Sequence, residues 1–331
     1  MKKVSIITPC FNGEAFVGRY LDSILAQTYK NIEMIFINDG STDRTEEIVK
    51  SYIKEFKKQG MSLIYIYQEN KGQAAALNKG LAIFSGDYLT WPDSDDILMP
   101  DNIEKKVAFL EENQEYGLVR TDAISVNEED IETITSYFAR NRSTRYSEEI
   151  FSQLIDETMY VCCGCYMVRV TAFLSVNPQR AIFESRGGQN WQMLLPITYK
   201  YKCGYIDEPL YVYVVRKSSH SHSVNTTIEE LSRCDEHELI LNTVVNAIKM
   251  SNQEKKQYLD IIEQKYLRKR LVLASRNCDA EIAKINFRKL NSKFKVSKGE
   301  IVLYIMSKNK LLKLVGKVLF KVVGLIKLAR S

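Results

Sequence analysis

The chain has 331 residues, 45% of them apolar, which is enough for one large domain and an accessory part. Its net charge of +5 comes from the end of the chain. Residues 301–331 contain seven of the 46 cations and no acid, so the rest carries 39 cations against 41 acids, or −2. The body of the chain is therefore not the basic surface that nucleic-acid binding requires.

The first ninety residues alternate between short apolar runs and helical patterns. The expected strands are 4–9, 32–39, 62–68 and 87–91, and the expected helices are 13–27, 42–59 and 74–85. This order predicts an α/β fold with right-handed crossovers and a mainly parallel sheet flanked by helices on both faces. Such sheets bind ligands at the carboxyl ends of their strands.

Polar residues gather where three of these strands end, at 8–12, 38–41 and 93–96. Asp93, Ser94, Asp95 and Asp96 directly follow the run YLTWP. Clustered carboxylates repel one another unless a cation lies between them, and hard divalent ions bind carboxylates together with substrate phosphates. The cluster therefore predicts a metal and diphosphate site.

Two further features of this region have ordinary structural explanations. Ser41, Thr42 and Asp43 follow Gly40 and are good helix-capping residues, which leaves only Asp39 unexplained. The small residues of loop 70–80 let a ligand approach the backbone, but they also allow tight helix packing.

Beyond residue 150 the pattern is less regular. We expect a helix at 148–155, a strand at 161–170, a turn at Gly187-Gly188, a helix at 189–201, a strand at 208–216 and a charged helical segment at 227–291. The predicted domains are the α/β domain at 1–225, a helical accessory region at 226–300 and a basic helix at 301–331.

The seven cysteines do not form a zinc-binding pattern. Cys10, Cys203, Cys234 and Cys278 are scattered, whereas Cys162, Cys163 and Cys165 cluster without a nearby histidine. The run VCCGCYMVRV predicts a buried structural strand. Unpaired thiols fit a reducing cytosol, and the short apolar stretch of MKKVSIITPC leads us to expect no secretory leader.

Over about residues 3–220 the chain resembles the family 2 glycosyltransferases of GT-A fold. The segments that carry the resemblance are VSIITPCFNGEAFVGRYLDSILAQTYKNIEMIFINDGSTDRT and NKGQAAALNKGLAIFSGDYLTWPDSDD, in that order. The resemblance implies an inverting transferase that uses a nucleoside-diphosphate sugar, with a UDP-sugar as the expected donor and Mn²⁺ or Mg²⁺ as cofactor.

The resemblance also implies roles for single residues. Thr8, Pro9 and Asn12 would lie beside the nucleoside, and Asp39 would accept a hydrogen bond from a uracil-type base. Asp93 and Asp95 match the DxD element. With Asp96 beside them, they would hold the metal, the ribose and the diphosphate, whose developing charge a cation stabilises.

Three positions depart from the family pattern. Gln189-Asn190 stands where relatives often carry the acids that supply the catalytic base, and amides do not take up protons near neutral pH. Glu184 is the first substitute for that base, with a solvated loop acid as the alternative. Asn38 replaces a common Asp, and Leu77 replaces a frequent Arg that would contact phosphate.

The loop RKSSHSHS after the last expected strand adds candidate ligands. The loop contributes Arg216, Lys217, His220 and His222: one of the two histidines would complete the metal shell or bond the diphosphate, and Arg216 would offset the diphosphate charge, with an ordinary polar loop as the alternative. Trp191 is interpreted as a core residue or an acceptor-stacking platform.

In the tail, Lys310, Lys313, Lys317 and Lys321 recur three or four residues apart beside an apolar stripe. This pattern indicates a helix lying on an anionic membrane surface and not spanning it, with packing on its own domain or a dimer contact as alternatives.

Together these features predict a glycosyltransferase that moves a hexose-type unit to a glycan or lipid-linked acceptor. We expect it to act in surface polysaccharide synthesis at the inner membrane face. Two alternatives remain: a catalytically silent nucleotide-sugar binder or scaffold, and a sugar nucleotidyltransferase. The segment TPCFNGEAF lacks the basic residue that a nucleotidyltransferase's activating loop carries.

Overall fold

The computed structural model describes residues 1–185, 187–216, 226–309 and 311–314. The chain divides into two compact units, Met1–Ser219 and His220–Ser331. This division groups everything after residue 220 together, so the predicted boundary between an accessory region and a separate tail at residue 301 stays a prediction.

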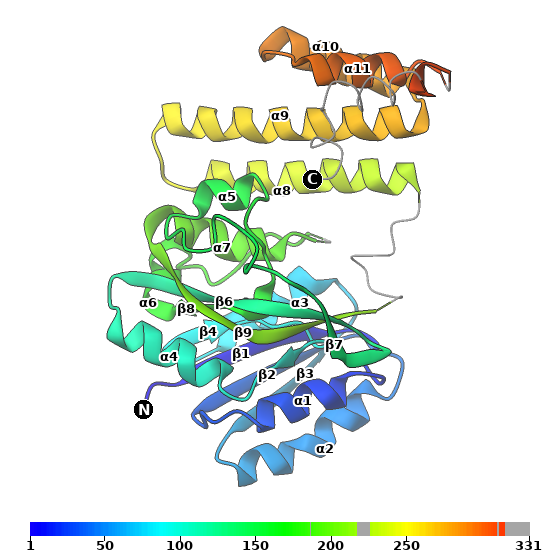
Figure 1. Ribbon diagram of the computed structural model, residues 1–331. Helices are drawn as coiled ribbons and strands as arrows, with labels where there is room; N and C mark the ends of the chain where they lie inside the picture. Colours follow the sequence, from blue (N-terminus) through cyan, green and yellow to red (C-terminus); the bar gives the residue numbers. More distant parts are fainter. Residues whose placement is uncertain (186, 217–225, 310, 315–331) are drawn as a thin grey trace. The chain divides into compact units, whose positions relative to one another are not determined.

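Unit 1 is built on a mixed sheet with the strand order β3-β2-β1-β4-β8-β6-β9-β5, with β7 paired to β6 (Figure 1). Its strands are β1 (Val4–Cys10), β2 (Ile32–Asp39), β3 (Ser62–Gln68), β4 (Tyr88–Thr90), β5 (Ile97–Leu98), β6 (Tyr116–Asn127), β7 (Asp130–Tyr137), β8 (Tyr166–Arg169) and β9 (Lys202–Val215). The α/β fold class predicted from the sequence is confirmed.

The parallel half of the sheet is the part that the sequence predicted. β1 pairs in parallel with both β2 and β4, and β2 pairs in parallel with β3. Every residue of β2 is buried, which is why its sequence is a nearly continuous apolar run and not an alternating one. Beyond β4 the sheet becomes mixed, because β8 is antiparallel to both β4 and β6 while β9 is parallel to β6.

The helices of unit 1 are α1 (Val17–Leu25), α2 (Thr45–Lys58), α3 (Gln73–Ile83), α4 (Asn102–Glu112), α5 (Phe151–Ile155), α6 (Val170–Val176) and α7 (Gln189–Lys200). α3 packs on β1 and β2, and α2 packs on β3 and α1. α4, β6 and β7 were not predicted from the sequence. The prediction of a strand at 161–170 was only partly correct. It was wrong about the first half of the cysteine-bearing strand, since Cys163–Cys165 forms a 3-10 turn and the strand β8 begins only at Tyr166.

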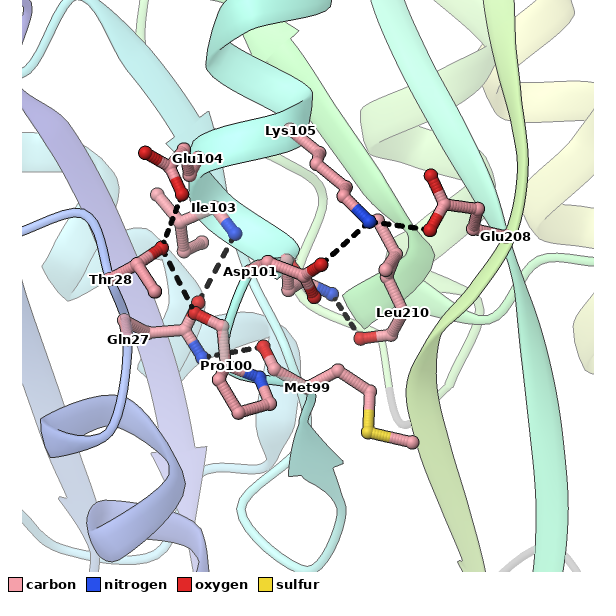
Figure 2. A network of polar contacts seen from close by, with 11 residues as sticks. Gln27, Thr28, Met99, Pro100, Asp101, Ile103, Glu104, Lys105, Glu208 and Leu210 are labelled. Carbon is pink, nitrogen blue, oxygen red and sulfur yellow. Dashed lines mark hydrogen bonds and ion pairs between the residues drawn. The ribbon is translucent and has the colours of Figure 1, made fainter.

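A polar network joins the end of α1 to the segment after the acidic cluster (Figure 2). Gln27 donates to the carbonyl of Met99 at 2.9 Å and accepts from the N–H of Ile103 at 3.1 Å. Lys105 forms ion pairs with Asp101 at 2.6 Å and with Glu208 of β9 at 2.5 Å. The residues between β4 and α4 are thereby anchored to the loop after α1 and, through Lys105, to β9.

Unit 2 contains α8 (Thr227–Ala247), α9 (Asn252–Asn277), α10 (Ala280–Lys293) and α11 (Lys298–Met306). Capping boxes begin three of them, with Thr226 and Glu229, Ser251 and Glu254, and Ser297 and Glu300 as the reciprocal pairs. α9 packs against α8, α10 and α11. Among the described residues, no helix has the length and apolar character needed to cross a membrane.

Candidate active site

The site lies where the carboxyl ends of β1, β2 and β4 meet. Cys10 at the end of β1 is level with Asn38 of β2, and Asp39 is level with Gln68 of β3. Thr8 donates to the carbonyl of Pro92 at 3.1 Å, so the acidic cluster that follows Pro92 lies beside the end of β1. The predicted gathering of the three polar clusters at one sheet edge is therefore present in the structure.

Asp39 is buried, with 4% of its surface exposed, and it organises the loop before α3. Its Oδ1 accepts from Gln68 Nε2 at 2.7 Å and from the Lys71 N–H at 2.9 Å, and its Oδ2 accepts from the Gly72 N–H at 2.9 Å. Gly40 is required next to it, because its φ is +77° and a Cβ there would lie 2.6 Å from the Asn70 nitrogen. Asp39 thus fixes the conformation of the loop at Lys71 and Gly72, and its contact with a base stays a prediction.

The residues assigned to the nucleoside occupy different environments. Thr8 is fully buried and shares a 2.5 Å hydrogen bond with the hydroxyl of Tyr20. Asn12 is exposed, has a φ of +50°, and accepts from the Thr42 N–H at 2.9 Å, which ties the loop after β1 to the start of the loop before α2. Pro9 is the partly buried residue between them in β1.

Asp93, the first carboxylate of the cluster, is held by two neutral donors. Gln73 Nε2 donates to Oδ1 at 2.8 Å and the Cys163 thiol donates to Oδ2 at 3.0 Å. Burial, followed by repulsion from the carboxylate of Asp95, raises the pKa of Asp93 to about 6. A cation bound between the two carboxylates would relieve that repulsion.

Asp95 is paired with a cation of the protein itself. Arg216, at the end of the described part of unit 1, donates to Oδ2 through Nε at 3.0 Å and through Nη2 at 2.5 Å. The guanidinium also lies 4.1 Å from the ring centroid of Phe16, and Arg19 donates to the Asp95 carbonyl at 3.0 Å. The predicted association of Arg216 with the site therefore takes the form of an ion pair to a carboxylate.

Asp96 is turned inward. It is 1% exposed, and its two oxygens accept from the Tyr211 hydroxyl and from the Val214 N–H, each at 2.8 Å. Burial first, and then the charges of Asp95 and Asp93, raise the pKa of Asp96 well above its usual range. Both oxygens are engaged with β9, so Asp96 fastens the cluster to the sheet, and its role as a metal ligand stays a prediction.

The comparisons with known proteins bear on this site. The model of "Glycosyl transferase family 2" matches residues 5–175, which include Asp39 and the whole acidic cluster. The chain belongs to glycosyl transferase family 2.

Two curated relatives match this chain over different lengths. The putative glycosyltransferase EpsE of Bacillus subtilis is 28% identical over 250 residues, which cover 73% of this chain and 86% of EpsE. An uncharacterized glycosyltransferase of Rickettsia typhi is 45% identical over 107 residues, or 32% of this chain and 31% of that protein. For five of the curated relatives, including the Rickettsia typhi protein, the matched part of this chain covers about a third or less of the relative's length.

Solved structures share the fold. TarS of Staphylococcus aureus in complex with UDP-GlcNAc has a TM-score of 0.59 at 18% identity and covers 92% of this chain and 79% of that one. The mannosyltransferase PcManGT of Pyrobaculum calidifontis, in complex with GDP-Man and Mn²⁺, has a TM-score of 0.58 at 14% identity, covering 96% and 86%.

In this family 2 chain, the position expected for the catalytic base is occupied by a structural amide. Asn190 Oδ1 accepts from the indole N–H of Trp91 at 2.9 Å, and Asn190 Nδ2 donates to the carbonyl of Val161 at 3.0 Å. Gln189 is buried at the start of α7, and Glu184 is exposed in the loop before it. The role of Glu184 as a base stays a prediction.

The remaining predicted residues are partly outside the described chain. Lys217, His220 and His222 lie among residues 217–225, which the structure does not describe. Trp191 is 6% exposed and packs in the core, as one of its two interpretations required. Leu77 is 1% exposed on α3, so the side chain that replaces the frequent Arg contributes to packing.

Sequence reasoning missed the residues that hold the acids in place, namely Gln73, Cys163, Tyr211 and Arg19. Cys163 and Tyr211 are 70 and 115 residues from their partners, and no local pattern links such distant positions. The run CCGC is unusual, but cysteines at this spacing suggest at most a metal site. Its contact with a carboxylate could be recognised only from the fold.

The residues present fit one hard cation shared with a substrate. Asp93 and Asp95 would supply carboxylate oxygens to it, and the guanidinium of Arg216 lies against Asp95 as a positive charge. Among the described residues, no group of three or more His, Cys, Asp or Glu could hold a metal without help. A bound Mn²⁺ or Mg²⁺ would therefore take its remaining ligands from a diphosphate and water.

Proposed function

We propose that this chain transfers a sugar from a nucleoside-diphosphate sugar, with a UDP-sugar as the expected donor, to a glycan or lipid-linked acceptor. The observation that carries the proposal is the pair of carboxylates, Asp93 and Asp95, at a strand-end edge shared with Asp39 and Asn12. Family membership supports it, and Mn²⁺ or Mg²⁺ is the expected cofactor.

The proposed reaction is a single displacement. The bond between the anomeric carbon and the diphosphate oxygen breaks, and its electron pair leaves with the diphosphate. An acceptor hydroxyl forms the new bond from the opposite face with inversion, and its proton passes to a base. A bound cation would supply charge stabilisation for the leaving group, while Asp93 and Asp95 hold that cation and Arg216 moves its charge from Asp95 toward the diphosphate.

We propose Glu184 as the base that takes up this proton. Glu184 is exposed and adjacent to α7, so its carboxylate is free to reach a bound acceptor. Replacing Glu184 with Gln keeps the size and removes the proton acceptor. Unchanged turnover in Glu184→Gln would remove Glu184 from the mechanism.

A panel of nucleotide-sugars with and without Mn²⁺ tests the function directly. Release of free nucleoside diphosphate should depend on the metal and on one donor, and Asp95→Asn should abolish it. Asp130→Asn on the exposed strand β7 is the matched control and should retain it. Metal-dependent turnover that survives in Asp95→Asn would contradict the site assignment.

A silent nucleotide-sugar binder is the second candidate, because both polar atoms of the Asn190 amide are engaged where a base is expected. Asn190→Asp keeps the acceptor for Trp91 and adds a carboxylate. Donor binding without turnover in the wild type, with turnover gained in Asn190→Asp, would establish the silent binder.

We further propose that unit 2 meets an anionic bilayer surface, which would place the enzyme at the inner membrane face in surface polysaccharide synthesis. α10 and α11 bury Ala283, Leu303 and Tyr304 toward α9. Exposed positions of these two helices combine apolar and basic residues. The apolar ones are Ile285, Ile301 and Ile305, with 40–49% of their surface exposed, and the basic ones are Lys284, Arg288 and Lys298, with the exposed Lys308 just after α11.

Leu311 and Leu314, 72% and 65% exposed, add to the apolar character within the predicted basic helix 301–331, of which residues 315–331 lie outside the described chain. Cosedimentation with vesicles tests the surface. Binding to phosphatidylserine-containing vesicles should fall in the variant with Ile301→Ser and Ile305→Ser together, and persist in Ile228→Ser, which removes an exposed isoleucine from α8. Dimerisation without vesicle binding would assign the surface to a second copy.

A further inference from the structure

The segment Cys162–Cys165 has no role in the proposed chemistry so far, yet it reaches the acidic cluster. Cys163 is 1% exposed, and its thiol donates to Asp93 Oδ2 at 3.0 Å. The other oxygen of the same carboxylate accepts from Gln73 at the first position of α3. Two elements far apart in the sequence therefore fix the orientation of one carboxylate.

The turn that carries the thiol is held in place by two contacts of Gly164. Gly164, the next residue, lies against the ring of Tyr211, where a Cβ would come within 1.9 Å of Cε2. The carbonyl of Gly164 accepts from the buried Lys106 ammonium at 2.7 Å. The turn is thus clamped between β9 and α4, and Cys163 projects from a rigid support.

We propose that Cys163 is a positioning residue for Asp93, and that its S–H donation holds this carboxylate in the orientation that binds a metal–nucleotide complex. The inference rests on the proposed nucleotide site. Hydrogen-bond partners of carboxylate ligands restrict the directions in which the carboxylate can face a cation, and losing one typically lowers metal affinity 10- to 100-fold. Cys163→Ser keeps a hydrogen-bond donor on a side chain of nearly the same length, whereas Cys163→Ala removes the donor.

The test is the Kd of UDP in saturating Mn²⁺, and of Mn²⁺ in saturating UDP, measured by calorimetry on the full chain. We expect Cys163→Ala to weaken both by about 10-fold and Cys163→Ser to stay within about 3-fold of the wild type. The control is Cys165→Ala, a fully buried cysteine two residues away in the same turn. Cys165→Ala should lower the thermal stability about as much as Cys163→Ala does, but it should leave the Kd of UDP and the Kd of Mn²⁺ unchanged.

A double-mutant cycle separates positioning from general damage. In an Asp93→Asn background, replacing Cys163 with Ala should no longer change the Kd, because the carboxylate that it orients is gone. If Cys163→Ala does not fold, Cys163→Val fills the space without a donor and takes its place in the cycle.

Equal weakening by Cys165→Ala, a Kd unchanged in Cys163→Ala, or additive effects in the cycle would each overturn the inference. A wild-type protein that binds no nucleotide with any metal would instead overturn the proposed function. The two failures are therefore distinguishable.

Discussion

Replacing Arg216 with Met should strengthen the binding of Mn²⁺ in the absence of nucleotide. Two nitrogens of Arg216 donate to one oxygen of Asp95, at 3.0 and 2.5 Å, and the side chains are only 16% and 20% exposed. At an effective dielectric constant of about 20, two unit charges about 4 Å apart attract by about 4 kcal/mol, and desolvation offsets part of this. A net contribution of about 2 kcal/mol is typical of a charge-assisted hydrogen bond.

An incoming cation must displace this guanidinium, so its removal should lower the Kd for Mn²⁺ by about 30-fold, which corresponds to about 2 kcal/mol. In the same variant the Mn²⁺–UDP complex should bind more weakly, because the diphosphate loses the cation that Arg216 would otherwise supply. The free-ion signal of Mn²⁺ in electron paramagnetic resonance measures the first quantity, and calorimetry measures the second.

Arg44→Met is the matched control. Arg44 also pairs with a carboxylate, that of Glu47, but both side chains are about 70% exposed and outside the site. Its loss should leave both affinities unchanged. The reasoning is refuted if Arg216→Met binds Mn²⁺ no more tightly than the wild type, or if Arg44→Met has the same effect.

The remaining predictions concern stability and the base pocket. Burial lowers the pKa of Lys106 to about 8. Between pH 8 and 10.5 the unfolded chain therefore binds more protons than the folded chain, so the free energy of unfolding should rise with pH. Relative to Lys106→Met, the wild type should gain about 3 kcal/mol across that window. Urea denaturation at several pH values measures this, and a pH-independent difference would contradict it. Gly164→Ala should lower the free energy of unfolding by about 2–3 kcal/mol, because the added Cβ would overlap Tyr211. Gly187→Ala, with nothing within 4 Å of its added Cβ, should leave stability nearly unchanged, and thermal denaturation compares the two variants. Asp39→Asn places an NH₂ group against one of the backbone N–H donors of Lys71 and Gly72, which should lower the free energy of unfolding by about 1–3 kcal/mol. It should also weaken UDP binding in calorimetry. Unchanged stability and affinity would show that Asp39 is not part of the nucleotide site.

The sequence by itself determined the parallel half of the sheet. The runs that became β1 and β2 are mainly apolar on both faces, and helical patterns separate them from each other and from β3, so the local pattern is enough to predict parallel strands with β1 and β2 buried. The acidic cluster is also local, because four consecutive residues carry three carboxylates. Its position at a sheet edge follows from the strand that precedes it.

Only the tertiary structure decided what each carboxylate contacts. Asp93, Asp95 and Asp96 are nearly adjacent in the sequence, yet one faces Gln73 and a thiol, one faces Arg216, and one faces β9. These partners are between 20 and 121 residues away, and their approach depends on the pairing of β6, β8 and β9. Mixed strand pairing is set by long-range packing and not by local pattern. The same physical reason explains why CCGC was predicted as a strand and is a turn: β9 and α4, which clamp it, come from distant parts of the chain.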